Sequence, residues 1–245
     1  MAGAGASRTC HDARMTSAGA GSAGVGRPRH APEQRPGATG REQILDAAAE
    51  LFTQYGYAGT STRMIAMAVG IKQASLYYHF ASKDDILSGL LKGTVQPSLD
   101  VARRLARAKQ PPHLQLYALT LFDVRALVAD RWNLGSLQNQ PELRADRYAE
   151  FRHERDALRK AYGRPIAEGV QEGVFTLPTA TAADATALVF AFVESVIAMR
   201  SDELLPVRDD MGHVIAAGAL RVLGCAERTI APAARAAENL LAGLS

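Results

Sequence analysis

The stretch Thr60–Lys83 constrains the fold more than any other part of this chain. Its apolar residues recur at helical spacing on both sides of a single glycine, Gly70. Ile65 and Val69 lie four apart and share one face of a short helix, and Gly70 supplies the positive φ of a sharp turn. A second short helix, Gln73–His79, follows. The pattern is typical of a helix-turn-helix unit, and it is also compatible with an ordinary helical hairpin inside a core.

The outer face of the second helix indicates what such a unit would bind. Leu76 points toward the first helix, and the opposite side offers Gln73, Ser75, Tyr77 and Tyr78. These are short or flat hydrogen-bonding groups rather than a run of solvated charges. In a helix-turn-helix unit the second helix lies in the DNA major groove. The outer face is therefore compatible with DNA as a partner, and the ordinary helical hairpin remains an equal alternative on spacing alone.

The run from Thr39 to about Leu91 resembles the N-terminal DNA-binding domain of the tetracycline-repressor (TetR) family of bacterial transcriptional regulators. The matching segments are ILDAAAELFTQYGYAGTS, RMIAMAVGI and LYYHFASKDDIL, in the same order and at the same spacing. Two positions depart from the usual pattern: Lys72 stands where a serine or threonine commonly caps the second helix, and Ala74 stands where glycine is frequent. The resemblance implies an all-α, cytoplasmic, homodimeric regulator of transcription, most often a repressor released from a palindromic operator by a small molecule.

The resemblance also implies roles for individual side chains at the DNA. Contacts to base edges would fall to Arg63, Gln73, Ser75 and Tyr77. Contacts to phosphates, which position the protein without specifying sequence, would fall to the remaining polar residues of the unit: Thr60, Ser61, Lys72, Tyr78, His79 and Lys83.

The charge distribution adds little support to DNA binding. The net charge is +3, but residues 1–41 carry six arginines against two acidic residues, so the rest of the chain sums to about −1. Residues 1–38 hold almost no large apolar side chain and are expected to be disordered. They are either a passive tail, an extension upstream of a start at Met15, or an arginine arm that lies along the DNA backbone.

The remaining chain divides into predicted helices and no strands. We expect a DNA-binding domain over residues 39–91, a helical ligand-binding and dimerisation domain over residues 92–224, and a tail over residues 225–245 with room for one more helix. Capping patterns at Thr39–Glu42, Ser82–Asp85 and Thr181–Asp184 predict three helix starts, and prolines mark other boundaries. The expected helices cover residues 39–56, 83–107, 113–131, 141–163, 181–201, 207–223 and 232–244, with a short segment at 165–173.

A helix over residues 113–131 is apolar on nearly every side, which indicates a central position. It carries Asp123 and Arg125, which are costly to bury unless paired, so they are expected to emerge at an edge or to form structural pairs with other charges. The functional alternative is that Arg125 meets an acidic group of a ligand. Flat side chains nearby could line a pocket or belong to the ordinary core. The ligand candidates are Tyr117, Phe122, Arg125, Trp132, Phe151 and Phe175.

Two apolar helices near the C-terminus have more apolar surface than one core can bury. The resemblance implies that they pair with their copies in a four-helix dimer interface, whereas a deep core within one chain is the alternative. The candidate interface residues are Leu188, Phe192, Val196, Met199, Ile215, Gly218 and Val222.

Other functional classes lack sequence support. We find no glycine-rich phosphate loop, nucleophile elbow, paired carboxylates or metal-ligand spacing, so no catalytic residue, metal or cofactor is predicted. Ala185–Met199, the longest apolar stretch, is too short for a membrane helix and contains Glu194, so no membrane partner is expected. A DNA-binding regulator that needs no ligand, or an activator, remains the alternative function.

Overall fold

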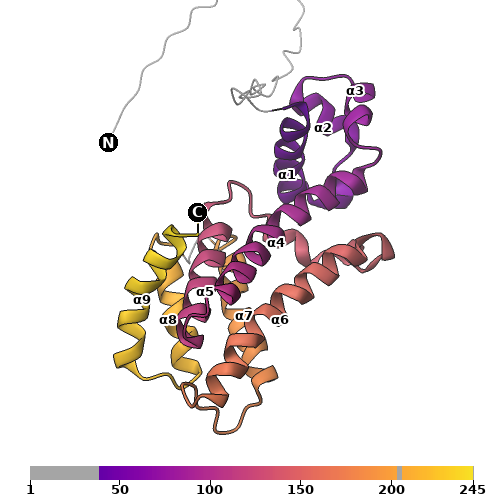
Figure 1. Ribbon diagram of the computed structural model, residues 1–245. Helices are drawn as coiled ribbons and strands as arrows, with labels where there is room; N and C mark the ends of the chain where they lie inside the picture. Colours follow the sequence, from indigo (N-terminus) through magenta and orange to yellow (C-terminus); the bar gives the residue numbers. More distant parts are fainter. Residues whose placement is uncertain (1–38, 203–205, 245) are drawn as a thin grey trace, which may run out of the picture. The chain divides into compact units, whose positions relative to one another are not determined.

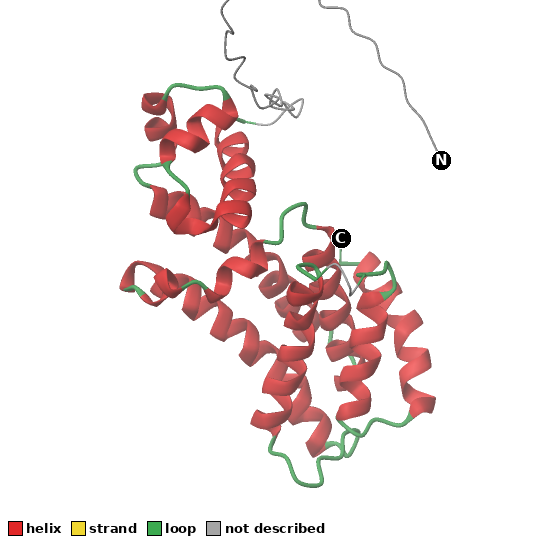
Figure 2. Cartoon of the chain, turned by 180° about the vertical axis from the view of Figure 1, so that it is seen from behind, coloured by secondary structure: helices red, strands yellow, loops and turns green. Residues whose placement is uncertain are grey.

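The computed structural model describes residues 39–202 and 206–244, and within these ranges the chain is helical and contains no strand. The elements are α1 (Gly40–Gly59), α2 (Thr62–Val69), α3 (Gln73–His79), α4 (Lys83–Arg107), α5 (Pro112–Ala129), α6 (Ala149–Gln171), α7 (Ala182–Met199), α8 (Met211–Val222) and α9 (Glu227–Ala242), with 3-10 segments η1 (Leu134–Asn139), η2 (Pro141–Arg144) and η3 (Asp146–Tyr148) between α5 and α6 (Figures 1 and 2). The all-α prediction is confirmed. The expectations for residues 1–38, including the start at Met15 and the arginine arm, lie outside the described residues.

Helices α1 to α3 and the start of α4 form the head. Thr39 and Glu42 make the predicted capping box of α1, and Gly56 has a φ of 75° where regular helical geometry is interrupted. The structure extends α1 through this kink to Gly59, past the expected end at Gly56. Gly70 adopts the left-handed conformation between α2 and α3, with a φ of 80°. The apolar sides of the helices meet in a core that includes the fully buried Leu76.

Helix α4 runs from the head into the helical body (Figure 1). The Ser82 hydroxyl accepts a hydrogen bond from the Asp85 amide, as the sequence predicted for its N-cap. Pro97 lies inside the helix, and buried apolar residues continue on either side of it, from Ile86 to Leu105. A single element therefore contributes to the cores of both parts.

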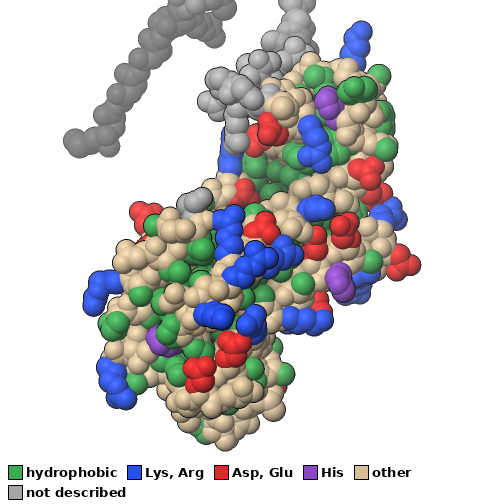
Figure 3. Space-filling model, in the orientation of Figure 1, with side chains coloured by type: hydrophobic (Ala, Val, Ile, Leu, Met, Phe, Trp, Pro, Cys, Tyr) green, Lys and Arg blue, Asp and Glu red, His purple; other side chains and the backbone are tan. Residues whose placement is uncertain are grey.

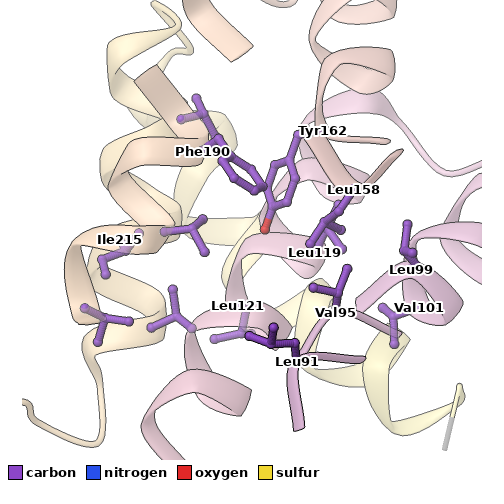
Figure 4. Close-up of a cluster of buried hydrophobic side chains, with 14 of the residues drawn as sticks. Leu91, Val95, Leu99, Val101, Leu119, Leu121, Leu158, Tyr162, Phe190 and Ile215 are labelled. Carbon is purple, nitrogen blue, oxygen red and sulfur yellow. The ribbon is translucent and has the colours of Figure 1, made fainter. Parts of the chain in front are cut away.

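Helix α5 is the centre of the body, as its apolar circumference predicted. It contacts α4, α6, α7, α8 and α9. Its buried side chains join the cluster in Figure 4, where Tyr162 of α6 lies beside Phe190 of α7 and its hydroxyl points into the cluster. The ring centroids are 5.6 Å apart in an edge-to-face arrangement.

Three expectations about the C-terminal helices were wrong. The helix expected over residues 141–163 starts at Ala149 and continues through Pro165 to Gln171, because tertiary packing against α4, α5 and α7 outweighs one missing N–H. Helix α9 begins at Glu227 rather than near Pro232, and it packs against α5 and α8.

The third expectation was that the apolar stretch ending at Met199 is too short for a membrane helix. Helix α7 has 18 residues and is long and apolar enough to cross a membrane by length and composition. A core helix of a bundle passes the same test, and α7 contacts α5, α6 and α8.

Candidate DNA-binding surface and effector cavity

Helix α3 is held by one buried residue and presents the rest of its surface outward. Leu76 is fully buried, whereas Gln73, Ser75, Tyr77, Tyr78 and His79 are all exposed. The exposed fraction is 47% for Tyr77 and 88% for Tyr78. Large aromatic side chains are rarely left this open without a partner surface. The exposure matches the requirement of a helix that enters a groove.

Hydrogen bonds to α2 orient two of these side chains. Gln73 Nε2 donates to the Thr62 Oγ1 atom at 2.9 Å, and the Tyr77 hydroxyl lies 3.2 Å from the same Oγ1 atom. Gln73 and Tyr77 are four residues apart, so one hydroxyl at the start of α2 reaches both. Sequence reasoning missed Thr62; its place directly after the Ser61 cap, opposite that pair, is the signal that could have found it. Sequence reasoning also did not single out Met67, an apolar side chain that is 70% exposed on α2.

Two predicted phosphate contacts are wrong because their side chains are engaged internally. Thr60 is 2% exposed, and its hydroxyl donates to the carbonyl oxygens of Leu51 and Gly56. Lys83 Nζ donates to the carbonyl oxygens of Tyr57 and Thr60, at 2.9 and 2.8 Å, and lies over the Tyr57 ring. Both side chains stabilise the junction between α1 and α2 instead of facing solvent.

The other phosphate candidates remain at the surface. Ser61 accepts the Met64 amide as the N-cap of α2. Lys72 is exposed and makes no side-chain cap, which agrees with its departure from the family pattern. The head contains four Lys and Arg against five Asp and Glu over residues 39–91. Charges of both signs also alternate over the face in Figure 3. The head therefore lacks the excess of positive charge that would attract DNA by itself.

A carboxylate at the start of α4 links the head to the beginning of α6. The Asp84 carboxylate accepts hydrogen bonds from the hydroxyls of Tyr57 and Tyr148, at 2.5 and 2.6 Å, and from Arg147 at 2.5 Å. Burial, followed by the bond to Asp84, raises the pKa of Tyr57 to about 12. Burial alone would raise the pKa of Asp84, but its three donors together lower it. A second link joins Trp132 Nε1 to Asp46 of α1 at 3.0 Å.

A cavity of about 340 Å³ lies in the body beside the head. Its walls come from α4, α5, α6, α7, η1 and one residue of α1, Leu45. The lining is mostly apolar, and it includes three carboxylates and two guanidinium groups: Asp123, Asp130, Glu194, Arg155 and Arg200. This volume and composition are typical of a small-molecule site.

None of the six predicted ligand residues lines this cavity. Arg125 makes an ion pair with Glu238 of α9 at 2.5 Å, which is the structural alternative for this residue. Tyr117 is buried, with its hydroxyl 2.9 Å from His213 Nδ1. Trp132 is partly buried and bonded to Asp46. Tyr117 and Arg125 are directed away from the cavity because their side of α5 faces α8 and α9, whose docking the sequence did not reveal.

The other three aromatic candidates also lie elsewhere. Phe122 packs against the core, and Phe175 packs on Gly169, where a Cβ atom would come within 2.3 Å of its ring. Phe151 borders a second recess along α6. Helical periodicity identifies apolar side chains but does not distinguish those that fill a core from those that border an opening.

The Asp123 carboxylate is the most unusual group of the cavity wall. It is 4% exposed, and its Oδ2 accepts a hydrogen bond from Tyr162 at 2.6 Å. Burial raises the pKa of Asp123 to about 6, against the opposing effects of the Ser98 and Tyr162 hydroxyls. No described residue forms a hydrogen bond of acceptable geometry with Oδ1. The sequence located Asp123 on a buried helix but did not predict this partner.

The candidate dimerisation residues separate into two groups. Leu188 and Val222 are 48% and 46% exposed, and a Cβ atom at Gly218 would meet nothing within 4 Å. Phe192 and Met199 are partly buried. Val196 and Ile215, in contrast, are 0% and 8% exposed within one chain, so they were wrong as interface residues. The structure adds Val214, 45% exposed on α8, which the prediction missed.

Comparisons with known proteins agree with this architecture. The family described as bacterial regulatory proteins, tetR family, matches residues 44–90. The crystal structure of AmtR from Mycobacterium smegmatis superposes with a TM-score of 0.78 at 48% identity, covering 85% of this chain and 97% of that one. The transcriptional repressor KstR2 of Mycobacterium tuberculosis is 28% identical over 137 residues, which are 55% of this chain and 68% of that protein. These relatives are transcriptional regulators rather than enzymes, and the chain belongs to the TetR family of DNA-binding transcriptional regulators.

Proposed function

We propose that this protein is a homodimeric repressor that binds a palindromic operator and leaves it when a small molecule occupies the body. The observation that carries the proposal is the exposed polar face of α3, whose Gln73 and Tyr77 are both hydrogen-bonded to Thr62. Repression is supported by the matching KstR2, which is a transcriptional repressor, and by IcaR of Staphylococcus aureus, a negative transcriptional regulator that is 48% identical over 52 residues. A bacterial regulator that binds chromosomal DNA acts in the cytoplasm, where that DNA lies.

The exposed head residues divide between bases and phosphates. Arg63, Gln73, Ser75 and Tyr77 contact base edges, where each good pair discriminates by about 1–3 kcal/mol. The phosphate contacts come from the exposed polar residues around them: Ser61, Lys72, Tyr78 and His79.

Dimerisation supplies a second α3 helix, which a palindromic operator with two half-sites requires. In one chain, α7 and α8 expose the apolar side chains of Leu188, Val214 and Val222. Burying these side chains against a second copy stabilises the dimer. Gly218 allows the two copies of α8 to approach closely. A two-fold dimer then places two α3 helices at half-sites about one DNA turn, roughly 34 Å, apart.

Release depends on coupling between the cavity and the head. Leu45 of α1 borders the cavity, and so do Gly89 to Ser98 on the helix that leaves the head, α4. A ligand that fits the cavity in only one arrangement of these elements shifts the spacing of the two heads. Such a coupling is typically about 1–3 kcal/mol.

The test is selection of bound duplexes from a randomised pool by the full-length protein, followed by size measurement of the complex. We expect an enriched palindrome bound by two chains. The variant Gln73→Ala should lose the enrichment, whereas Arg103→Ala, an exposed change on α4 far along the chain from the head, should retain it. A monomer that shows no preference among duplexes would refute the proposal.

A further inference from the structure

The Asp123 carboxylate leaves one strong acceptor unused at the wall of the cavity. Its Oδ2 atom is occupied by the Tyr162 hydroxyl, and Oδ1 has no hydrogen-bond partner among the described residues. The Ser98 hydroxyl from α4 is near enough to affect the carboxylate and lines the same cavity. A buried carboxylate oxygen without a donor is costly, so such an atom calls for a partner that the chain itself does not supply.

The two guanidinium groups of the cavity do not fill this role, because both are bound elsewhere. Arg155 donates through Nε and Nη2 to Glu194, with Nε at 3.1 Å from the carboxylate oxygen. Arg200 donates to the backbone carbonyl oxygens of Leu127 and Asp130. The fifth charged group, Asp130, accepts the backbone amide of Trp132. The lining therefore has one more carboxylate than cations, and neither guanidinium group is hydrogen-bonded to Asp123.

We propose that the cavity binds a small molecule with a protonated amine on an apolar body, and that the ammonium group donates to Asp123 Oδ1. An ammonium group has three donors and no acceptor, so it can satisfy Oδ1 and also reach the Ser98 hydroxyl. The apolar body lies against side chains such as Leu158, Val193 and Ile197. A carboxylate ligand would meet an excess of like charge and no free guanidinium group. The role of this molecule as an effector rests on the proposed function, but its binding does not.

Three probes with one apolar body separate the alternatives: 4-phenylbutylamine, 4-phenylbutan-1-ol and 4-phenylbutanoate. Each is titrated calorimetrically into the full-length protein at pH 7. We expect the amine to bind about 10–100-fold more tightly than the alcohol, as a charge-assisted hydrogen bond should provide, and the acid to bind most weakly. This ranking in the unmodified protein tests the class of ligand, and a variant then tests the role of Asp123.

The variant Asp123→Asn assigns the preference to one residue. Asparagine keeps an oxygen for the Tyr162 hydroxyl and removes the charge, so the amine should lose its advantage over the alcohol. Asp100→Asn is the matched control, because Asp100 is exposed on α4 and its ion pair is with the neighbouring Arg103, at 2.7 Å. The proposal fails if none of the probes binds, if the acid binds best, or if the amine keeps its advantage in Asp123→Asn.

Addition of the amine to the protein on its selected duplex distinguishes this proposal from the proposed function. If the amine binds through Asp123 and the DNA complex persists, the proposed class of ligand is supported and the proposal that this ligand releases DNA is refuted. If DNA dissociates in the unmodified protein but not in Asp123→Asn, both stand.

Discussion

Replacing Asp123 by asparagine should stabilise the protein at neutral pH and remove one component of its pH dependence. Burial raises the pKa of Asp123 from 3.8 to about 6, so the folded state holds this proton more tightly than the unfolded chain does. The resulting stability is present below pH 4 and is lost as the pH rises through 6. The full shift corresponds to about 3 kcal/mol, of which about 2 kcal/mol is lost between pH 4.5 and 7.

The assay is urea unfolding of the unmodified protein and Asp123→Asn at several pH values between 4.5 and 7. One protein concentration is used throughout, because the stability of a self-associating chain depends on its concentration. The difference between the two proteins cancels the titration of the other carboxylates, including Glu238, whose pKa the bond from Arg125 lowers to about 2. We expect the advantage of the variant to grow by about 2 kcal/mol across this range. Asp100→Asn should show no such trend. A constant difference, or a variant that becomes relatively less stable as the pH rises, would refute the assignment of a raised pKa to Asp123.

Three further substitutions test other parts of the molecule. Tyr77→Ala should abolish specific operator binding in a gel-shift assay while the dimer stays folded. One base contact is lost in each chain of the proposed dimer, which together costs about 2–6 kcal/mol, and unchanged affinity would contradict the role of this residue. Leu188→Glu should convert the dimer to a monomer in light scattering, since it places a charge on the exposed apolar face of α7, and a persistent dimer would place the interface elsewhere. Asp84→Asn should lower the free energy of unfolding by about 1–3 kcal/mol and speed amide exchange around Tyr148, because Arg147 loses its charged partner; exchange at the unmodified rate would show that this link does not hold the head.

The head could be predicted closely because its signals are local. The bounds of α3 and α4 follow from Gly70, Leu76 and the Ser82 cap, each of which acts within one turn of chain. The residues that failed there, Thr60 and Lys83, have polar side chains of types that also contact phosphates. Both are hydrogen-bonded to carbonyl groups of α1 or of the residue that follows it, and such tertiary partners leave no pattern in the local sequence.

The body resisted prediction because its structure depends on contacts between distant segments. Pro165 normally marks a helix boundary, yet α6 continues through it under the packing of neighbouring helices. The docking of α9 supplies Glu238, which takes Arg125 away from any ligand role. The cavity is formed by side chains that share the same apolar spacing as the core. Among the residues that line it, Asp123, a carboxylate on a mostly apolar helix, offered a sequence signal, but its orientation required the structure.

The hydrogen bond from Gln73 to the Thr62 hydroxyl affects how tightly the head can bind DNA. Gln73 loses up to about 2 kcal/mol of rotamer freedom when it is fixed, and a side chain that is free before binding meets that entropic cost at the interface. In this head Thr62 restrains the amide while the chain folds, so the penalty is displaced from recognition to folding. Thr62→Val should therefore weaken operator affinity even though Thr62 itself need not touch the duplex.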